Sequence, residues 1–270
     1  MAEYPYRFYR ALHRGNEGDV EFYRRAMYGA ESVLELGAGD GRIARALVDE
    51  GLRVTALERS SEAIHLGRSA PGGDEVQWIE GQMEHFELGE RFDRIIAPYT
   101  AMFCLLDSEA LLGCLRAVRA HLERDGLFIF DVWPADDFHA EGEVDQDEDE
   151  ESDAGSGKGS GGWRDDWQED ELAPVEVDGV RYRVFESSRW DRAAQLLDVR
   201  YRYEPEGGGE PVEGAIPQRY FLVPEILRAL EDAGLFALVL HGGFDQRAYD
   251  EDSERLVVTA ARRDSTLFTQ

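Results

Sequence analysis

A short apolar run followed by three alternate glycines constrains this chain more than any other feature. Residues 33–36 have the composition of a buried strand, and Gly37, Gly39 and Gly41 follow them. Apolar residues at helical spacing begin at Ile43. A strand, a glycine turn and a helix bring bare backbone N–H groups and a helix N-terminus close to a ligand. Glycine is needed there because a Cβ would block both the turn and the ligand's approach.

A carboxylate follows the second predicted strand at the distance typical of nucleotide-binding folds. Residues 54–57 form the next apolar run, which ends at Glu58. Such folds place an acidic residue about 20 residues past the glycine turn, where it accepts hydrogen bonds from ribose hydroxyls. A glycine turn that only closes a strand–helix junction is the alternative, and it gives no reason for Glu58.

The spacing of the glycines separates two kinds of cofactor. A dinucleotide fingerprint would need a third glycine at position 42, which is Arg42. The pattern Glu35-x-Gly37-x-Gly39-x-Gly41 instead resembles motif I of the class I S-adenosylmethionine-dependent methyltransferases, which usually carry an acidic residue two positions before the first glycine. A sulfonium cofactor is positively charged and tolerates nearby carboxylates, whereas a pyrophosphate does not. The resemblance implies S-adenosylmethionine as the cofactor.

The resemblance also implies a set of cofactor-binding residues. Glu35 and Asp40 would lie near the ammonium group, and Glu58 would accept from both ribose hydroxyls. Gln82 would contact the adenine amino group, where the family usually has Asp, and Met83 would pack on the ring. The implied set is Tyr23, Glu35, Gly37, Ala38, Gly39, Asp40, Glu58, Arg59, Gln82, Met83 and Ala97.

Two of these assignments have a plain structural alternative. Residues 19–25 look like a helix before the first strand, and in the resembling family such a segment often presents a tyrosine to the cofactor. A helix that buries Phe22 and Tyr23 against the sheet explains the same pattern. An ordinary strand-end loop is the alternative for Gln82 and Met83.

The apolar runs predict an α/β fold. We expect a seven-stranded, Rossmann-like, doubly wound sheet, mostly parallel, with an antiparallel last strand at its edge. Asp125 and Gly126 are expected to turn the chain into the fifth strand. The predicted strands are residues 33–36, 54–57, 76–80, 92–96, 127–130, 235–240 and 256–261.

The composition changes after the fifth strand. Residues 141–162 are acidic and then rich in glycine and serine, so we expect a disordered loop. Three later stretches alternate in strand fashion, with a hairpin turn at residues 191–194, and predict a small antiparallel sheet. They are residues 180–190, 195–204 and 215–222.

These observations predict two regions. Residues 1–134 and 223–270 would form the Rossmann-like core that binds S-adenosylmethionine. Residues 135–222 would form an insertion that contains the acidic loop and antiparallel strands that cover a substrate pocket. Inserted sheets of this kind are similar to those of sugar-amine and glycine N-methyltransferases.

The catalytic residues stay unknown from the sequence, but position marks four pocket candidates: Tyr99, Trp133, Arg219 and Tyr220. Residues 97–100 follow the fourth strand and resemble motif IV of the same family. Arg219 would pair with a substrate carboxylate or phosphate, or else face solvent. An amine acceptor need only be neutral, whereas a hydroxyl acceptor benefits from a base. The six histidines are scattered, and none is a compelling base.

Composition limits the partners. The net charge of −28 argues against nucleic acid and anionic membranes. No apolar run approaches the ~20 residues of a membrane span, and the first residues contain no apolar signal region. Cys104 and Cys114 are not spaced as a metal site, so we expect no metal and reduced core thiols. The expected protein is cytoplasmic, a monomer or homodimer, and acts on a small molecule.

The leading hypothesis is a methyltransferase of class EC 2.1.1 that modifies the N or O of a small-molecule metabolite. An NAD(P)-dependent oxidoreductase is an alternative, and Arg42 weighs against it. A non-catalytic cofactor-binding protein is another, and methylation of a basic protein also stays open.

Overall fold

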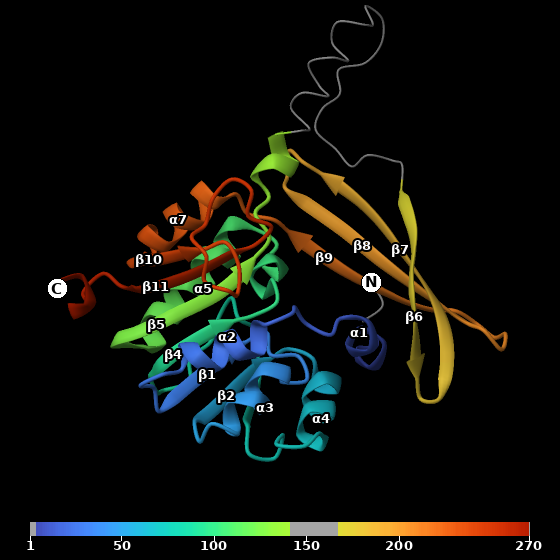
Figure 1. The fold of residues 1–270 in the computed structure, drawn as a ribbon, viewed down its shortest axis with the longest axis horizontal. Coiled ribbons are helices and arrows are strands. Elements are labelled where there is room, and N and C mark those ends of the chain that lie inside the picture. The colour runs from blue at the N-terminus through green and yellow to red at the C-terminus, as the bar shows by residue number, and fades with distance from the viewer. Residues whose placement is uncertain (1–3, 141–166, 270) are drawn as a thin grey trace, which may run out of the picture. The chain divides into compact units, whose positions relative to one another are not determined.

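The computed structural model describes residues 4–140 and 167–269 (Figure 1). The chain divides into two compact units. The larger unit comprises Gly15–Trp133 and Pro224–Gln270, and the smaller unit comprises Met1–Arg14 and Pro134–Val223. The acidic loop expected at residues 141–162 lies outside the described residues. Among the helices of the described ranges, none is both long and apolar enough to cross a membrane.

The larger unit is built on a seven-stranded sheet with the order β10-β11-β5-β4-β1-β2-β3. The pairings from β5 to β3 are parallel, and β11 is antiparallel to both of its neighbours, so the predicted fold class is confirmed. The strands are β1 (Ser32–Leu36), β2 (Arg53–Glu58), β3 (Gln77–Glu80), β4 (Phe92–Ala97), β5 (Leu122–Val132), β10 (Leu235–His241) and β11 (Leu256–Arg262).

The position of the last strand differs from the prediction. β11 lies between β10 and β5, so β10 forms the edge instead. Leu256, Val257 and Val258 of β11 are fully buried, whereas Val239 of β10 is 41% exposed. The strand with the more buried side chains takes the internal position, which its spacing in the sequence did not reveal.

Helices cover both faces of this sheet (Figure 1). On one face, α2 (Asp19–Ala26), α3 (Arg42–Val48) and α4 (Ser61–Ser69) share an apolar cluster with β1, β2 and β4. Side chains alternate along a strand, so the other face carries residues such as Leu34, and α5 (Ser108–His121) and α7 (Val223–Asp232) cover it. A short 3₁₀ helix, η1 (Ala101–Cys104), follows β4.

The fifth strand is longer than predicted. It begins at Leu122 and passes through Asp125 and Gly126, which were expected to form a turn. Phe92 pairs with Leu122 and Arg94 pairs with Leu127, so the extra residues of β5 bulge out of the ladder. Gly126 fits there because a Cβ would lie 3.0 Å from the carbonyl oxygen of Asp93.

The smaller unit holds a four-stranded antiparallel sheet in the order β6-β7-β8-β9. Three of these strands and the hairpin turn after Asp191 were predicted, and β6 was not. Helix α1 (Tyr6–Leu12) shares an apolar cluster with one face of this sheet. The strands are β6 (Gln168–Val177), β7 (Val180–Asp191), β8 (Leu196–Pro205) and β9 (Val212–Arg219).

Candidate functional site

Most predicted site residues follow strands that end at one edge of the larger sheet. β1 to β5 are parallel, so the segments after them meet at the same edge. The chain order reverses between β1 and β4, which is where open α/β sheets form ligand crevices. These segments are the glycine turn after β1, Arg59 after β2, Gln82 and Met83 after β3, Tyr99 after β4 and Trp133 after β5.

The glycine turn uses backbone conformations that side chains rarely adopt. Gly37, Gly39 and Gly41 have φ values of 63°, 60° and 70°. A Cβ added at Gly37 would lie 3.2 Å from the Cβ of Ala101, and one at Gly41 would lie 2.5 Å from the ring of Trp78. The turn therefore packs tightly and leads directly into α3 at its left-handed last residue, Gly41.

Glu58 ties the end of β2 to this turn. Its side chain is only 9% exposed. The N–H of Gly39 donates to Oε2 at 2.8 Å, and the N–H of Ser60 donates to Oε1 at 2.8 Å. The predicted ribose-binding carboxylate is thus held by backbone donors on both oxygens, while each oxygen keeps a lone pair for a further donor.

Glu35 is buried on β1, on the face that α2 and α3 cover. Burial raises its pKa to about 8, although a hydrogen bond from the backbone of Ala44 and the charge of Arg42 act in the opposite direction. Its Oε2 is buried and has no hydrogen-bond partner among residues 4–140 and 167–269. A cationic ligand group beside this oxygen would supply the missing interaction.

Arg42 fills the position where a dinucleotide fingerprint has its third glycine. Its guanidinium donates to both oxygens of Asp19, at 2.8 and 2.5 Å, and Asp19 is 1% exposed. The N–H of Asn16 donates to the same carboxylate at 2.9 Å. This ion pair joins the first turns of α2 and α3 beside the glycine turn.

Asp131, at the end of β5, is the centre of a second polar cluster. The hydroxyl of Tyr23 donates to its Oδ1 at 2.8 Å, and the Nη1 of Arg255 lies 3.3 Å from Oδ2. The Nη2 of Arg255 donates to the side-chain oxygen of Asn16 at 3.0 Å. Tyr23 is fully buried, and its hydroxyl already has a hydrogen-bond partner within the protein, Asp131.

Two pocket candidates lie at the same edge. Tyr99 has a φ of 57°, and its backbone N–H donates to Oδ1 of Asp131 at 2.9 Å. Burial raises the pKa of its phenol, while Arg42 and Arg255 lower it. Trp133 packs edge-on against Phe103, with ring centroids 5.5 Å apart.

The remaining cofactor candidates are more exposed or play backbone roles. Arg59 and Gln82 are exposed, and Met83 is half-buried. The carboxylate of Asp40 lies 3.6 Å from Arg45. Ala38 and Ala97 are buried small residues in the glycine turn and at the end of β4.

Arg219 and Tyr220 belong to the smaller unit. Nη2 of Arg219 donates to the side-chain oxygen of Gln195 at 2.9 Å. Tyr220 is fully buried, and its hydroxyl lies 3.0 Å from Nδ1 of His139. Their grouping with Tyr99 in one pocket stays a prediction.

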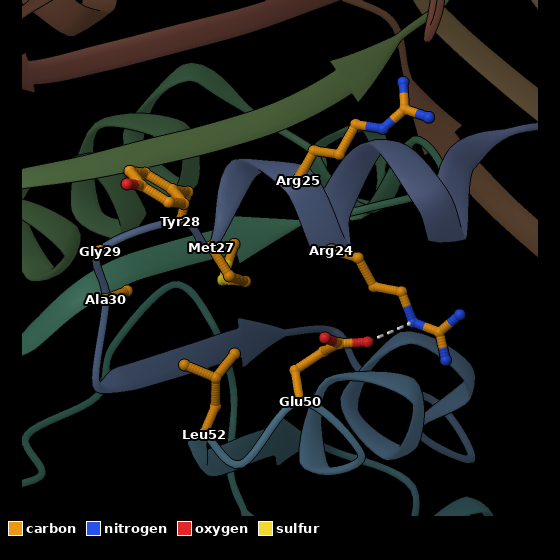
Figure 2. Close-up of a pocket in the computed structure, with 8 residues that line it drawn as sticks. All are labelled: Arg24, Arg25, Met27, Tyr28, Gly29, Ala30, Glu50 and Leu52. Atoms are coloured by element: carbon orange, nitrogen blue, oxygen red, sulfur yellow. Dashed lines mark ion pairs between the residues drawn. The ribbon is translucent and has the colours of Figure 1, made fainter.

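A hollow on the larger unit lies away from this edge. Figure 2 shows its lining between the last turn of α2 and the loop before β2, at the amino ends of β1 and β2. Arg24 pairs there with Glu50 at 3.3 Å, and Arg25 pairs with Glu21 at 2.9 Å. Both cations already have acidic partners, and none of the predicted site residues lines this hollow.

Sequence reasoning gave no role to Asp19 or Arg255, and it placed Asp131 near the active site only as part of the segment that closes the fifth strand. A signal existed for Asp131, because a charged residue directly follows the apolar run at 127–130. Asp19 lies 23 residues from its partner Arg42, and Arg255 lies 124 residues from its partner Asp131. Nothing local in the sequence joins residues that far apart.

Part of the chain matches a known protein family, and its fold matches solved structures. The family described as "Methyltransferase domain" matches residues 33–126, from β1 into β5. The CcbJ methyltransferase from Streptomyces caelestis is 25% identical to the chain, with a TM-score of 0.71 over 92% of this chain and 97% of that one. The region from β1 into β5 thus matches this methyltransferase family, and the chain has the fold of a class I S-adenosylmethionine-dependent methyltransferase.

Two further methyltransferases resemble the chain. CalS10 from Micromonospora echinaspora, an amino pentose methyltransferase solved with S-adenosylmethionine bound, is 19% identical, with a TM-score of 0.63 over 94% of this chain and 94% of that one. The cypemycin N-terminal methyltransferase of a Streptomyces species is 25% identical over 111 residues, 41% of this chain and 45% of the relative. The chain thus matches less than half the length of this curated relative.

The residues that match the family include the glycine turn, Glu35, Glu58 and Tyr99. The matched range therefore includes much of the edge of the sheet that the geometry singles out. Asp19 and Asp131 lie outside the matched residues.

Proposed function

We propose that the protein transfers the methyl group of S-adenosylmethionine to the nitrogen or oxygen of a small-molecule metabolite. The observation that carries this proposal is the tight glycine turn held by Glu58 at the point where the strand order reverses. The match of residues 33–126 to the methyltransferase domain family supports the same reaction class.

The residues at this edge suit the cofactor in two respects. The Glu35 oxygen that lacks a hydrogen-bond partner among the described residues suits a positively charged amino acid, whose ammonium group would also lie near Asp40. The positive φ values of Gly37 and Gly39 form a tight turn whose glycines carry no side chain, so the backbone of the turn suits close approach of a ligand. Gly37, Ala38 and Gly39 would hold the methionine portion, Glu58 the ribose, and Gln82 with Met83 the adenine.

When bound, the cofactor supplies an activated methyl group. The protein then has to place the acceptor in line with that group and exclude water, so orientation supplies much of the rate. Tyr99 and Trp133 are our candidates for this task in the larger unit, and Arg219 and Tyr220 in the smaller one. A neutral amine needs no strong base, whereas a hydroxyl acceptor would need one.

Among small-molecule acceptors, we propose amines first. CalS10 and the cypemycin enzyme are named for an amino sugar and a peptide amino terminus. The net charge of −28 disfavours a nucleic acid and suits a cationic or neutral acceptor. The expected cytoplasmic location and the choice between monomer and homodimer stay predictions.

The test is a transfer assay with S-adenosylmethionine and a panel of amino sugars, small amines and short peptides. Mass spectrometry should detect a product heavier by one methyl group, together with S-adenosylhomocysteine. Glu58→Ala should abolish the signal, and Glu75→Ala, an exposed carboxylate before β3, should preserve it. A second panel of acceptors that carry hydroxyl groups but no amine is tested in parallel. Product with this second panel alone would move the assignment to oxygen. No product with either panel would count against the proposal.

A further inference from the structure

The turn after β4 adopts a conformation that its residues disfavour. Tyr99 and Thr100 have consecutive positive φ values of 57° and 61°, and the N–H of Ala101 donates to the carbonyl of Pro98 at 3.3 Å. This is the pattern of a type I′ turn, whose two central positions favour Asn and Gly. Threonine is β-branched and fits this region poorly, so the turn needs support from its surroundings.

Asp131 provides that support with two different acceptors. Its side-chain Oδ1 accepts from the N–H of Tyr99 at 2.9 Å, and its backbone carbonyl accepts from the N–H of Thr100 at 3.1 Å. Both backbone donors of the strained pair are therefore bonded to one residue of the neighbouring strand.

Asp131 is itself fixed from two other elements. Tyr23 of α2 and Arg255, just before β11, both contact its carboxylate, and the side chain is fully buried. Arg255 also lies over the ring of Phe244, 5.3 Å from the centroid. The acceptor that holds the turn is thus locked by α2 and by the β10–β11 connection.

The turn lies directly against the predicted cofactor site. β4 is the neighbour of β1, and Ala101, the last residue of the turn, packs so closely on Gly37 that no Cβ would fit there without a shift. If the turn relaxed to an ordinary conformation, Ala101 and Tyr99 would both move relative to the glycine turn.

We propose that Asp131 is a positioning residue, which holds the strained turn at residues 98–101 so that Ala101 and Tyr99 shape the cofactor site. This role rests on the proposed function, because it concerns the same site. Asp131 would not touch the cofactor itself; it would act by holding the backbone of Tyr99 and Thr100.

The test measures binding of S-adenosylhomocysteine by titration calorimetry. Asp131→Ala removes the side-chain acceptor, and we expect its dissociation constant to rise about tenfold or more. Asp131→Asn keeps an oxygen that accepts from Tyr99 but loses the acceptor of Arg255, so its affinity should lie between those of the wild type and Asp131→Ala. Asp93→Ala is the matched control, because Asp93 accepts the N–H groups of Glu31 and Ser32 at the opposite edge of the sheet.

A rescue experiment separates positioning from general loss of structure. Glycine adopts positive φ without strain, so Thr100→Gly should relieve the turn of its need for support. In the Asp131→Ala background, Thr100→Gly should recover most of the lost affinity, and in the Asp93→Ala background it should change nothing.

The outcomes distinguish this inference from the function on which it rests. Wild-type protein that binds S-adenosylhomocysteine, with an Asp131→Ala variant that is folded and binds equally well, would overturn the positioning role alone. An affinity lost in Asp131→Ala and not recovered by Thr100→Gly would do the same. Wild-type protein that does not bind would overturn the proposed function, and the positioning role with it.

Discussion

Glu35 and Glu58 are buried carboxylates on the same face of one sheet, yet their surroundings differ. Backbone N–H groups contact both oxygens of Glu58, whereas Oε2 of Glu35 has no hydrogen-bond partner in the described part of the chain. Burial raises the pKa of Glu35 to about 8, so this side chain keeps its proton near neutral pH. A cationic group placed beside it would favour ionisation, which couples the charge of Glu35 to the ligand.

Glu35 should make the stability of the free protein fall with pH. Between its ordinary pKa of 4.5 and about 8, the folded chain holds a proton that the unfolded chain has lost, so folding is disfavoured as pH rises. Glu35→Gln has no proton to lose in this range. As pH rises, the free energy of unfolding of the variant minus that of the wild type should therefore increase by up to about 1.4 kcal/mol per pH unit. Urea unfolding at pH 5, 6.5 and 8 checks this, with Glu75→Gln as the exposed control; a difference that does not change with pH would contradict it.

The ion pair of Asp19 and Arg42 should be sensitive to loss of one partner. Arg42→Ala leaves a buried carboxylate without its cation, which we expect to cost about 2–3 kcal/mol, less than for a fully buried pair because the Arg42 side chain is 30% exposed. Adding Asp19→Asn should recover part of this cost. Arg25→Ala, in an exposed pair with Glu21, should cost under about 0.5 kcal/mol in the same urea titrations. Equal costs for the two arginine variants would disprove the buried role.

At the scale of elements, local patterns predicted the strands of the larger unit and the helix before the first strand. Ser60 marks the start of α4 because its hydroxyl accepts the N–H of Ala63 at 3.2 Å. The short apolar run of β1 is buried at every position, as its composition required.

The cap of α4 gives a prediction at this scale. Ser60→Ala removes the acceptor of the Ala63 N–H and should lower the free energy of unfolding by about 1 kcal/mol. Ser61→Ala, one position along and exposed, is the matched control and should change it by less than about 0.5 kcal/mol. Chemical denaturation of both variants decides the matter, and an equal effect from the two would show that Ser60 does not cap the helix.

Three features of the fold were not predicted, each for a physical reason: strand β6, the bulge of β5 and the position of β11. β6 is mostly exposed and polar, so no alternation marked it, and it is held by its pairing with β7. The bulge of β5 depends on its pairing with β4, which lies 25 or more residues earlier. The place of β11 between β10 and β5 depends on competition between strands for the buried position, which no single stretch encodes.

At the scale of the whole molecule, the site divides into a local part and a long-range part. The glycine turn, Glu35 and Glu58 lie within one strand–helix–strand unit, so the sequence could predict them together. The contacts of Asp131 with Tyr23, Tyr99 and Arg255 span 108, 32 and 124 residues. They form only when the whole sheet closes, which is why sequence reasoning found Tyr99 as a candidate but not the residue that holds it.

The central claim is that this edge of the sheet binds S-adenosylmethionine through Glu58. Titration calorimetry with S-adenosylhomocysteine and, in parallel, NADH tests it most directly, using wild-type protein, Glu58→Ala and Glu75→Ala. Charge-assisted hydrogen bonds contribute about 1.5–3 kcal/mol each, and 1.4 kcal/mol is a factor of ten. We predict binding of S-adenosylhomocysteine but not NADH by the wild type and Glu75→Ala, and affinity at least about tenfold lower in Glu58→Ala. Binding of NADH alone, or an unchanged dissociation constant in a folded Glu58→Ala variant, would contradict the claim.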